Sequence, residues 1–409
     1  ALLLSMFFAA SAEAAEWLMW GGPNGDFKAE ASGLAEEWPD EGPKSLWSKD
    51  LGEGYSAILF ENDRLYTMFR SDDKEHVVCM SAKNGKKLWD YKYDSPVKDG
   101  HVKEFGNGPR ATPLIVGDRL YAIGVSGKMC CLDKKTGKAK WTHDLWEKFK
   151  GNFLNHGYSS SPVAYKNNII ALVGGEGASI VAFDAKTGKV KWKKHDFKNS
   201  YSTPEIIKID GKDQMLCYMA KELISINPAN GELLWKYDIG NQWGQNICQP
   251  IYEPKSGILF ITAVQAGCRG LKLEKTGSKY EVKEAWTQKR PDVHHSNAIL
   301  IGDTVYTSTG GRGPGLFYAV NIKTGETTWK ERGFSKATCV YGDGKFIILD
   351  EDGNLGLAVC TPKEFKILAQ SEVLTPSAWT VPTLIGHKVF VRDSKKIKAF
   401  DLSIGPSAS

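Results

Sequence analysis

The chain has 409 residues, of which 42% are hydrophobic and 25% are charged, a composition typical of globular proteins rather than of disordered or collagen-like chains. The 53 Lys and Arg residues against 48 Asp and Glu give a formal charge of +5, too small at this length to indicate a dedicated nucleic-acid surface. No window approaches the ~20 apolar residues of a membrane-spanning helix.

The first residues of the chain predict export. Residues 1–10 are mostly apolar, and the small residues Ala12 and Ala14 follow them. This pattern resembles a secretory signal peptide that ends near residue 15 and starts upstream of Ala1. We therefore expect a mature chain from residue 16, in the periplasm or outside the cell. A frayed apolar N-terminus is the alternative.

The cysteine content is even, which in an exported chain raises the question of disulfides. Most of these cysteines lie inside apolar runs, where they serve as small core residues, so we expect mainly free thiols. The eight positions are Cys79, Cys130, Cys131, Cys217, Cys248, Cys268, Cys339 and Cys360.

One phrase recurs along the chain: two apolar residues, an Asp or Asn, a short turn containing Gly, and a Trp four residues after the Gly. Residues 133–137 followed by Trp141, and 184–188 followed by Trp192, are clear copies. An alternating strand that ends at Asp and turns through Gly is a β-hairpin signal. Another turn upstream of each copy adds two strands, so each repeat predicts a four-stranded propeller blade.

The tryptophans of these repeats recur at intervals of 42 to 52 residues. We interpret the ring, placed once per blade, as a structural wedge between neighbouring blades rather than as a ligand contact. These structural tryptophans are Trp47, Trp89, Trp141, Trp192, Trp235, Trp286 and Trp329.

The intervals give six blades, and the 80 residues after Trp329 leave room for two more. The seventh blade is degenerate, because no Trp follows residues 352–354. The eighth stops before its Trp strand, which residues 45–48 supply from the N-terminus. We therefore predict an all-β fold: one eight-bladed β-propeller closed by the N-terminal strand. The boundaries are a signal peptide at 1–15, an N-terminal extension at 16–44, the propeller at 45–404 and a tail at 405–409.

The D-x-x-T-G-x-x-x-W phrase resembles the PQQ-type (pyrroloquinoline quinone) propeller repeat, which quinoprotein alcohol dehydrogenases share with BamB-type outer-membrane assembly factors. The resemblance covers residues 45–404. Residues 17–25 are also similar to the W-x-x-W-R-G-P-N-G opening of exported PQQ-binding-like propellers, with Gly21 where Arg is usual. The resemblance implies the fold, and leaves the function open because one fold carries many functions.

The resemblance raises the question of a quinone site. Dehydrogenases of this kind stack the quinone on a vicinal disulfide and a Trp and bind Ca²⁺. Here Cys130 and Cys131 fall inside a repeat strand, where neighbouring side chains point to opposite faces. We therefore expect no vicinal disulfide and no cofactor, with PQQ and calcium as the alternative.

The loops that precede the innermost strand of each blade are expected to line one mouth of the channel. Their residues are aromatic, hydroxyl-bearing, His or basic, with almost no carboxylate. An alternative is that they only cap strand ends and enclose water. The candidate ligand-binding residues are Tyr55, Arg110, His156, Tyr158, Tyr201, Asn246, His294, His295, Lys336 and Trp379.

The chemistry of this ring favours a neutral or anionic polar ligand, such as a sugar, a peptide or a carboxylated small molecule. Ca²⁺ requires several oxygen ligands, carboxylates among them, which the ring does not supply. Zn²⁺ bound by His294, His295 and His156 is disfavoured, because adjacent residues on a strand diverge. We expect no metal.

Three functions stay open. The favoured one is an exported, non-catalytic propeller that binds or scaffolds in the cell envelope, with an envelope protein, a polar small ligand or a glycan as its partner. The second is a PQQ-dependent oxidoreductase or a quinone-binding descendant. The third is a carbohydrate-active enzyme at the channel mouth, for which no carboxylate pair can be placed. We expect a monomer and no nucleic-acid partner.

Overall fold

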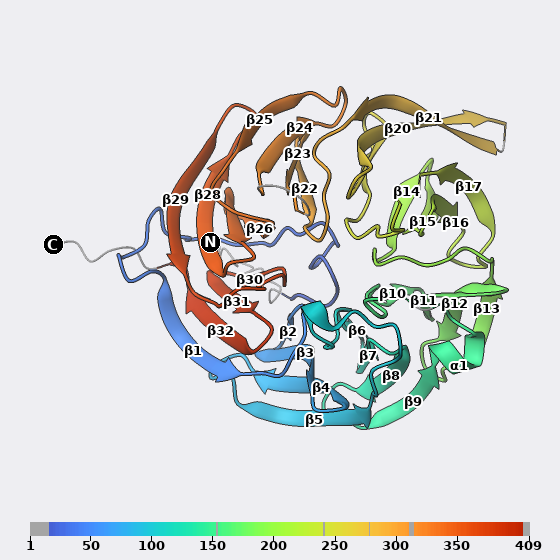
Figure 1. The fold of residues 1–409 in the computed structure, drawn as a ribbon, viewed down its shortest axis with the longest axis horizontal. Coiled ribbons are helices and arrows are strands. Elements are labelled where there is room, and N and C mark those ends of the chain that lie inside the picture. The colour runs from blue at the N-terminus through green and yellow to red at the C-terminus, as the bar shows by residue number, and fades with distance from the viewer. Residues whose placement is uncertain (1–15, 153, 240–241, 278, 311–314, 404–409) are drawn as a thin grey trace, which may run out of the picture.

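In the computed structural model, the strands β1 to β32 form eight four-stranded antiparallel sheets. The structure describes residues 16–152, 154–239, 242–277, 279–310 and 315–403. Figure 1 shows the sheets arranged as blades around a central axis, so the predicted eight-bladed β-propeller is confirmed. The expected signal peptide at 1–15 and tail at 405–409 lie outside the described residues.

Within a blade the strands follow one another from the channel to the rim (Figure 1). Blade 1 contains β2 (Leu59–Glu61), β3 (Arg64–Ser71), β4 (Lys74–Ser81) and β5 (Lys87–Asp94); blade 2 contains β6 (Leu114–Val116), β7 (Arg119–Ile123), β8 (Lys128–Asp133) and β9 (Ala139–Asp144); blade 3 contains β10 (Val163–Tyr165), β11 (Asn168–Gly175), β12 (Ala178–Asp184) and β13 (Val190–Lys194); blade 4 contains β14 (Glu205–Ile209), β15 (Lys212–Tyr218), β16 (Glu222–Ile226) and β17 (Leu233–Asp238).

The remaining blades repeat this order, except that the last one takes its outermost strand from the N-terminus. Blade 5 contains β18 (Ile251–Glu253), β19 (Ile258–Ala263), β20 (Gly267–Thr276) and β21 (Lys279–Gln288); blade 6 contains β22 (Ala298–Ile301), β23 (Thr304–Ser308), β24 (Phe317–Asn321) and β25 (Thr327–Glu331); blade 7 contains β26 (Thr338–Gly342), β27 (Lys345–Leu349), β28 (Asn354–Cys360) and β29 (Phe365–Glu372); blade 8 contains β30 (Thr383–Ile385), β31 (Lys388–Arg392), β32 (Lys396–Asp401) and β1 (Lys44–Asp50). A 3₁₀ turn, η1 (Lys103–Phe105), and a short helix, α1 (Leu145–Phe149), lie in the connections.

The repeated turn is stabilised by its own Asp, as the phrase indicates. In blade 2 the Asp133 carboxylate accepts hydrogen bonds from the backbone N–H and the hydroxyl of Thr136, both at 2.9 Å. The N–H of Gly137 then donates to the Asp133 carbonyl at 2.8 Å. Gly137 has a φ of 73°, a left-handed conformation that glycine adopts without steric cost.

The tryptophans join each blade to the next. The indole N–H of Trp141 in blade 2 donates to the Ala185 carbonyl in the turn of blade 3, at 3.2 Å. A Cβ on Gly188, in that same turn, would lie 2.7 Å from the Trp141 ring. The ring therefore packs directly on the glycine of the neighbouring turn. Trp47, Trp89 and Trp286 repeat both contacts, on Gly85, Gly137 and Gly325.

Trp235 departs from this pattern because the next hairpin is longer. In blade 5, β20 and β21 each have ten residues, so their turn lies beyond the reach of a ring in blade 4. The Trp235 indole instead donates to the Gln214 side-chain carbonyl of its own blade, at 2.9 Å. The wedge position is kept, while the hydrogen-bond partner changes.

Ring closure is built from both ends of the chain. β1 pairs with β32, with Trp47 opposite Ala399, as the sequence predicts. A second connection is Arg392 at the end of β31, which is fully buried. Its guanidinium donates to the carbonyls of Met68 at 2.6 Å and Gly52 at 3.2 Å, so a side chain of blade 8 binds the backbone of blade 1 and of the β1–β2 loop.

The N-terminal segment, residues 16–43, crosses the centre of the ring (Figure 1). Trp17 forms two backbone hydrogen bonds with Phe60 in β2. Further along, the Ala29 N–H donates to the Tyr341 carbonyl in β26, at 2.9 Å, and the Ala35 N–H donates to the Leu402 carbonyl at 2.8 Å. This segment therefore connects blade 1 with blades 7 and 8, on the two sides of the junction that closes the ring.

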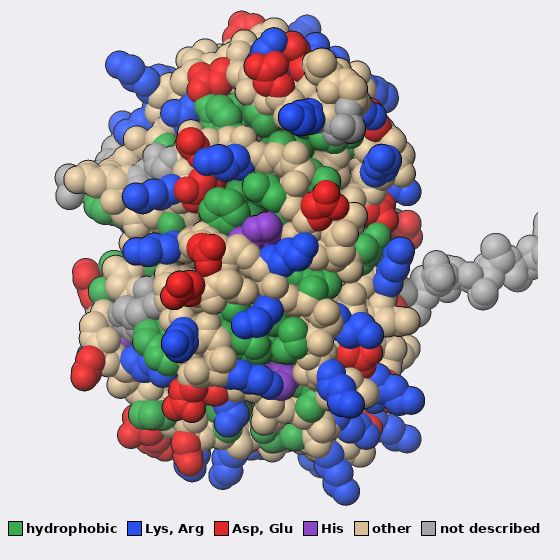
Figure 2. Space-filling model, turned by 90° about the vertical axis from the view of Figure 1, so that its right-hand side faces the viewer, with side chains coloured by type: hydrophobic (Ala, Val, Ile, Leu, Met, Phe, Trp, Pro, Cys, Tyr) green, Lys and Arg blue, Asp and Glu red, His purple; other side chains and the backbone are tan. Residues whose placement is uncertain are grey.

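The rim carries charges of both signs. Figure 2, which views the side of blades 3 and 4, shows Lys and Arg side chains mixed with Asp and Glu. Among the described residues, no helix has the length and apolar character that crossing a bilayer requires.

Replacing Gly188 by Ala tests the packing of Trp on glycine. Gly117 is the matched control, because it also has a positive φ, 58° against 71°, but nothing within 4 Å of an added Cβ. We expect Gly117→Ala to lower the free energy of unfolding by about 1 kcal/mol, the left-handed cost alone. Gly188→Ala should lower it by about 1–3 kcal/mol more, through displacement of Trp141. Equal losses in urea unfolding would contradict the wedge.

Replacing Arg392 by Met tests the second closure contact. The substitution removes a buried cation and leaves carbonyls of blade 1 without donors, so we expect a loss of about 3–5 kcal/mol of unfolding free energy. Arg332→Met, at an exposed position, serves as the control and should change stability by less than about 0.5 kcal/mol. An Arg392→Met protein as stable as this control would show that closure rests on β1 alone.

Candidate functional site

A cavity of about 290 Å³ lies at the mouth of the channel where the innermost strands begin. We call it the mouth cavity. Its lining residues are Trp20, Tyr55, Phe105, Arg110, His156, Ser159, Tyr201, Gln245, Ile247, His294, His295, Lys336 and Trp379.

Every blade contributes to this cavity through the loop before its innermost strand. Tyr55 comes from the loop between β1 and β2, Tyr201 from that between β13 and β14, and Trp379 from that between β29 and β30. Because the repeat places these loops in the same register, residues far apart in sequence converge. Trp20 is different, since it reaches the cavity from the segment that crosses the channel.

The structure brings together eight of the ten residues that the sequence singles out. Tyr158 and Asn246 lie outside the cavity wall. Gly157 has a φ of 76° and turns Tyr158 into the core between blades 2 and 3, where its hydroxyl donates to the Val173 carbonyl at 3.1 Å. Asn246 is fully buried, and its side-chain amide donates to the Met219 carbonyl at 2.6 Å.

Five lining residues were not predicted. Gln245 and Ile247 flank Asn246, so the alternation of an extended chain could have identified them. Ser159 belongs to a predicted loop, whereas Phe105 lies in the long connection that contains η1. Trp20 carries no repeat signal, because residues 16–43 lie outside the repeats.

Arg110 provides a half-buried positive charge in the wall. In the described part of the chain its guanidinium donates to the backbone carbonyls of Gly108, Phe105 and Gly106, at 3.1 to 3.3 Å, and to no carboxylate. It also lies over the Tyr55 ring, 5.7 Å from the centroid. Loss of solvent lowers the pKa of Arg110 from its usual value, and the nearby Tyr55, Tyr201, Glu75 and Glu53 offset this only in part.

Aromatic rings form a continuous chain along the wall. The Trp379 ring lies 5.1 Å from Tyr55, 5.5 Å from Phe105 and 4.9 Å from His295, between centroids. His156 continues the chain, at 5.8 Å from Phe105 and 5.9 Å from Tyr201. Such walls bind flat, partly apolar ligands.

The three histidines of the cavity are uncharged near neutral pH. Burial is the largest cause, and neighbouring positive groups add to it. The pKa of His156 falls to about 4, and those of His294 and His295 fall below their usual value. The Nε2 atom of His295 is buried and has no hydrogen-bond partner among the described residues.

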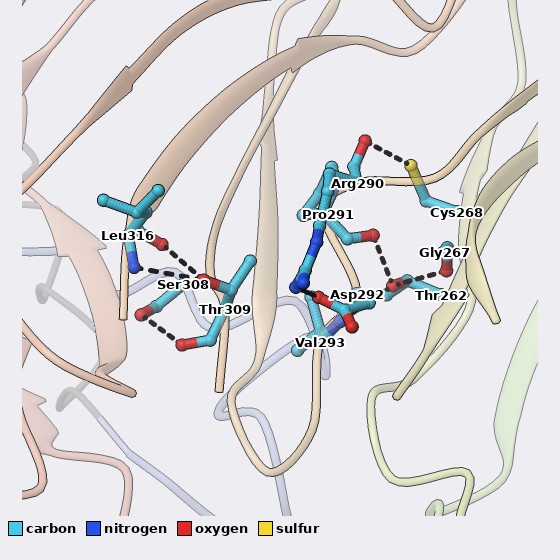
Figure 3. A network of polar contacts seen from close by, with 10 residues as sticks. All are labelled: Thr262, Gly267, Cys268, Arg290, Pro291, Asp292, Val293, Ser308, Thr309 and Leu316. Atoms are coloured by element: carbon cyan, nitrogen blue, oxygen red, sulfur yellow. Dashed lines mark hydrogen bonds and ion pairs between the residues drawn. The ribbon is translucent and has the colours of Figure 1, made fainter. Parts of the chain in front are cut away.

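The loop that carries His294 and His295 is held in place by Thr262 of the neighbouring blade 5. Figure 3 shows Thr262 of β19 close to the carbonyls of Gly267 and Pro291, at 3.0 and 3.2 Å, while its hydroxyl oxygen accepts the Val293 N–H at 3.1 Å. Arg290 and Asp292 form an ion pair beside it. These contacts hold the backbone directly before His294 and so fix the position of the two histidines.

The donor set does not fit a Ca²⁺-bound quinone. The residues that line the mouth cavity include no Asp or Glu, and Ca²⁺ binds through carboxylate and carbonyl oxygens. Within the described ranges, no three His, Cys, Asp or Glu side chains are grouped as a metal site. No step through a metal or a quinone is derived for this cavity.

Cys130 and Cys131 do not form a vicinal disulfide, in line with the expectation from their register in the repeat strand. Both thiols are free and buried. Cys130 packs in the large core cluster that includes residues of blades 1 and 2, and Cys131 packs in a separate cluster between blades 2 and 3. Their side chains therefore point to opposite faces of β8, as the register of the repeat indicates.

The repeats and their blades match a known family. The family model described as outer membrane protein assembly factor BamB matches residues 73–331, more than half of the chain. The chain therefore belongs to this family of PQQ-type repeat propellers.

The curated relatives include BamB proteins and quinone-dependent alcohol dehydrogenases. BamB of Yersinia pestis is 22% identical over 300 residues, which cover 69% of this chain and 71% of that protein. The quinohemoprotein alcohol dehydrogenase ADH IIB of Pseudomonas putida is 26% identical over 226 residues, which cover 53% of this chain and 29% of that enzyme. The match thus spans less than a third of that dehydrogenase.

Solved structures agree in fold. The computationally designed Ika8 protein superposes with a TM-score of 0.59 and 12% identity, over 88% of this chain and 99% of that one. A europium-containing methanol dehydrogenase gives a TM-score of 0.50 and 11% identity, over 95% and 98%. At these identities the likeness concerns the fold alone.

The pKa of His156 is open to direct measurement. In a ¹³C-edited NMR titration of the folded chain we expect its midpoint near pH 4. An unfolded His titrates near ~6.5, so as pH falls from ~6.5 towards 4 the unfolded state binds a proton that the folded state does not, and stability falls. His156→Gln should reduce this loss. A midpoint of 6.5 or above would contradict the burial of this imidazole.

Proposed function

We propose that this chain is an exported, non-catalytic propeller of the cell envelope that binds a small polar ligand, neutral or anionic, in the mouth cavity. The observation that carries the proposal is Arg110, a half-buried cation in the cavity wall whose hydrogen-bond partners are backbone carbonyls. A ligand carboxylate would supply the charge-assisted hydrogen bonds that such a guanidinium forms best.

The shape of the site supports a small ligand. At about 290 Å³ the cavity lies at the lower end of the ~300–1,000 Å³ range of small-molecule sites. Aromatic rings and a few polar groups line it, which is the usual composition of a binding site rather than of a water-filled channel.

A dehydrogenase is supported less well. The relatives named as quinone-dependent alcohol dehydrogenases share the repeats, but a Ca²⁺ site would need carboxylates that the cavity wall lacks. The cavity likewise offers no carboxylate pair for glycoside hydrolysis.

Docking of another envelope protein, suggested by the BamB relatives, is the second candidate. The outermost strands expose apolar side chains, but each belongs to a different blade, and single apolar residues at a surface need no partner. They are Leu46, Leu88, Val190, Leu233 and Ile367. A pull-down from envelope extract that recovers no stoichiometric partner would count against docking.

Replacing Arg110 by Met tests the cavity. We expect calorimetric titration with D-gluconate, D-glucose and 2-naphthoate to show saturable binding of at least one anionic probe. Arg110→Met should weaken that binding about tenfold or more, because it removes a charge-assisted hydrogen bond. Arg332→Met should leave it unchanged. If none of these probes binds in an Arg110-dependent way, the proposed function is wrong.

Titration with PQQ, with and without Ca²⁺, separates the two family functions. Tryptophan fluorescence reports binding, and a redox dye with an alcohol and sugar panel reports turnover. We expect no Ca²⁺-dependent dye reduction. Saturable, Ca²⁺-dependent binding with dye reduction would make this chain a quinoprotein dehydrogenase.

A further inference from the structure

We infer that the mouth cavity selects a ring-bearing ligand with a single negative charge, and that Glu351 sets this selectivity by neutralising Lys336. The inference rests on the proposed function and adds to it the charge of the ligand and the residue that determines it. Glu351 is outside the cavity lining and acts through Lys336, so it is a positioning residue.

Glu351 lies in the turn between β27 and β28, behind the cavity wall. Its two carboxylate oxygens lie 2.9 and 3.0 Å from the Lys336 ammonium. The same carboxylate accepts the Trp379 indole N–H at 3.3 Å and the Ser335 hydroxyl at 3.3 Å. One side chain therefore contacts two residues of the cavity lining.

The backbone fixes this arrangement. The Glu351 N–H donates to the Ser335 carbonyl at 3.1 Å, and the Glu351 carbonyl accepts the Ser377 N–H at 2.8 Å. Lys336 has a φ of 46° and Ser377 a φ of 74°, a conformation that costs free energy for residues other than glycine. The loops of blades 7 and 8 are thus held against the Glu351 turn, which is typical of a site that must keep its geometry.

The residues that line the cavity then carry one positive charge that no carboxylate pairs with directly. Lys336 is paired with Glu351, and burial keeps the three histidines uncharged near pH 7. Among the described lining residues, Arg110 is therefore the positive group that has no carboxylate within hydrogen-bond distance; Glu53 and Glu75 act on it only from further away. A ligand with one carboxylate satisfies Arg110. A second carboxylate near Lys336 would meet the Glu351 carboxylate, and repulsion between like charges at short range is costly.

Blade 7, the degenerate one, supplies Glu351 through its β27–β28 turn. Its β27–β28 turn is closed by Asp350, whose carboxylate accepts the N–H groups of Asp352 and Asn354, at 3.1 and 2.9 Å. This turn lies at the mouth, so it places Glu351 against the loops of blades 7 and 8. The turn that has lost the repeat motif is a different one, β28–β29 at residues 361–364, where the Thr361 carbonyl still accepts the Trp329 indole N–H at 2.7 Å.

Three probes of the same ring system test the inference: 2-naphthoate, naphthalene-2,6-dicarboxylate and the neutral 2-naphthamide. At fixed ionic strength we expect the chain to bind naphthoate about tenfold more tightly than naphthamide, and the dicarboxylate no more tightly than naphthoate. Glu351→Gln keeps an acceptor for Trp379 but frees Lys336. It should raise dicarboxylate affinity about tenfold and change naphthoate affinity about threefold or less.

The controls separate charge from folding. Glu364→Gln, on the same blade at its far end, should change no affinity. Lys336→Met removes the positive partner of the same ion pair, so it leaves the Glu351 carboxylate unpaired beside the cavity. It should weaken naphthoate binding about tenfold and spare naphthamide. In the double variant with both Glu351→Gln and Lys336→Met, the affinity for the dicarboxylate should no longer be raised.

The outcomes are distinct. An unchanged ratio of dicarboxylate to naphthoate affinity in folded Glu351→Gln, or a dicarboxylate that binds the unaltered chain more tightly than naphthoate, overturns the inference. If Glu351→Gln does not fold, unchanged naphthoate binding by Lys336→Met overturns it. Arg110-dependent binding of gluconate without binding of any naphthyl probe also overturns it, while the proposed function stands.

Discussion

Pairing of β1 with β32 is the constraint on which the whole molecule depends. A propeller is a closed ring, and its last blade here is made of strands from both ends of the chain. The cavity depends on the same junction, because Tyr55 follows β1 and Trp379 precedes β30, and their rings meet at 5.1 Å. Without closure these two walls would separate. Arg392, which binds carbonyls of blade 1 and of Gly52, lies directly beneath this junction.

Much of the fold follows from the sequence because its determinants are local. Most turns combine an Asp or Asn with a Gly, as at Asp133 and Gly137, and seven of the eight junctions contain a motif Trp. The Trp spacing gives six blades, and the length that remains gives the other two. The mouth could be predicted for eight residues because the repeat places their loops in register. Asn246 failed because an alternating segment was read one residue out of phase. Trp20 and Glu351 could not be found, since one lies outside the repeats and the other in the blade that has lost them.

Different parts of the chain stabilise the fold and line the channel, which explains how relatives of one fold can include assembly factors and dehydrogenases. Blade contacts such as Trp141 on Gly188 supply stability and impose no chemistry on the channel. The loops before the innermost strands determine the chemistry of the channel mouth, and here they present aromatic rings, neutral imidazoles and a guanidinium bound to carbonyls rather than to a carboxylate. The Glu351 carboxylate lies behind the wall, where it pairs with the Lys336 ammonium and accepts the Trp379 indole N–H.

The segment that crosses the channel has a consequence for how the protein matures. Trp20 forms part of the cavity wall, yet the segment around it bonds to Tyr341 and to Leu402, near the other end of the chain. Contacts of such sequence separation form slowly, because a long loop must close first. The earliest residues of the folded domain therefore wait for the last blade before they can take their place. The mouth cavity is therefore complete only after the last blade has formed, and a chain cut short at its C-terminus would lack part of the cavity wall.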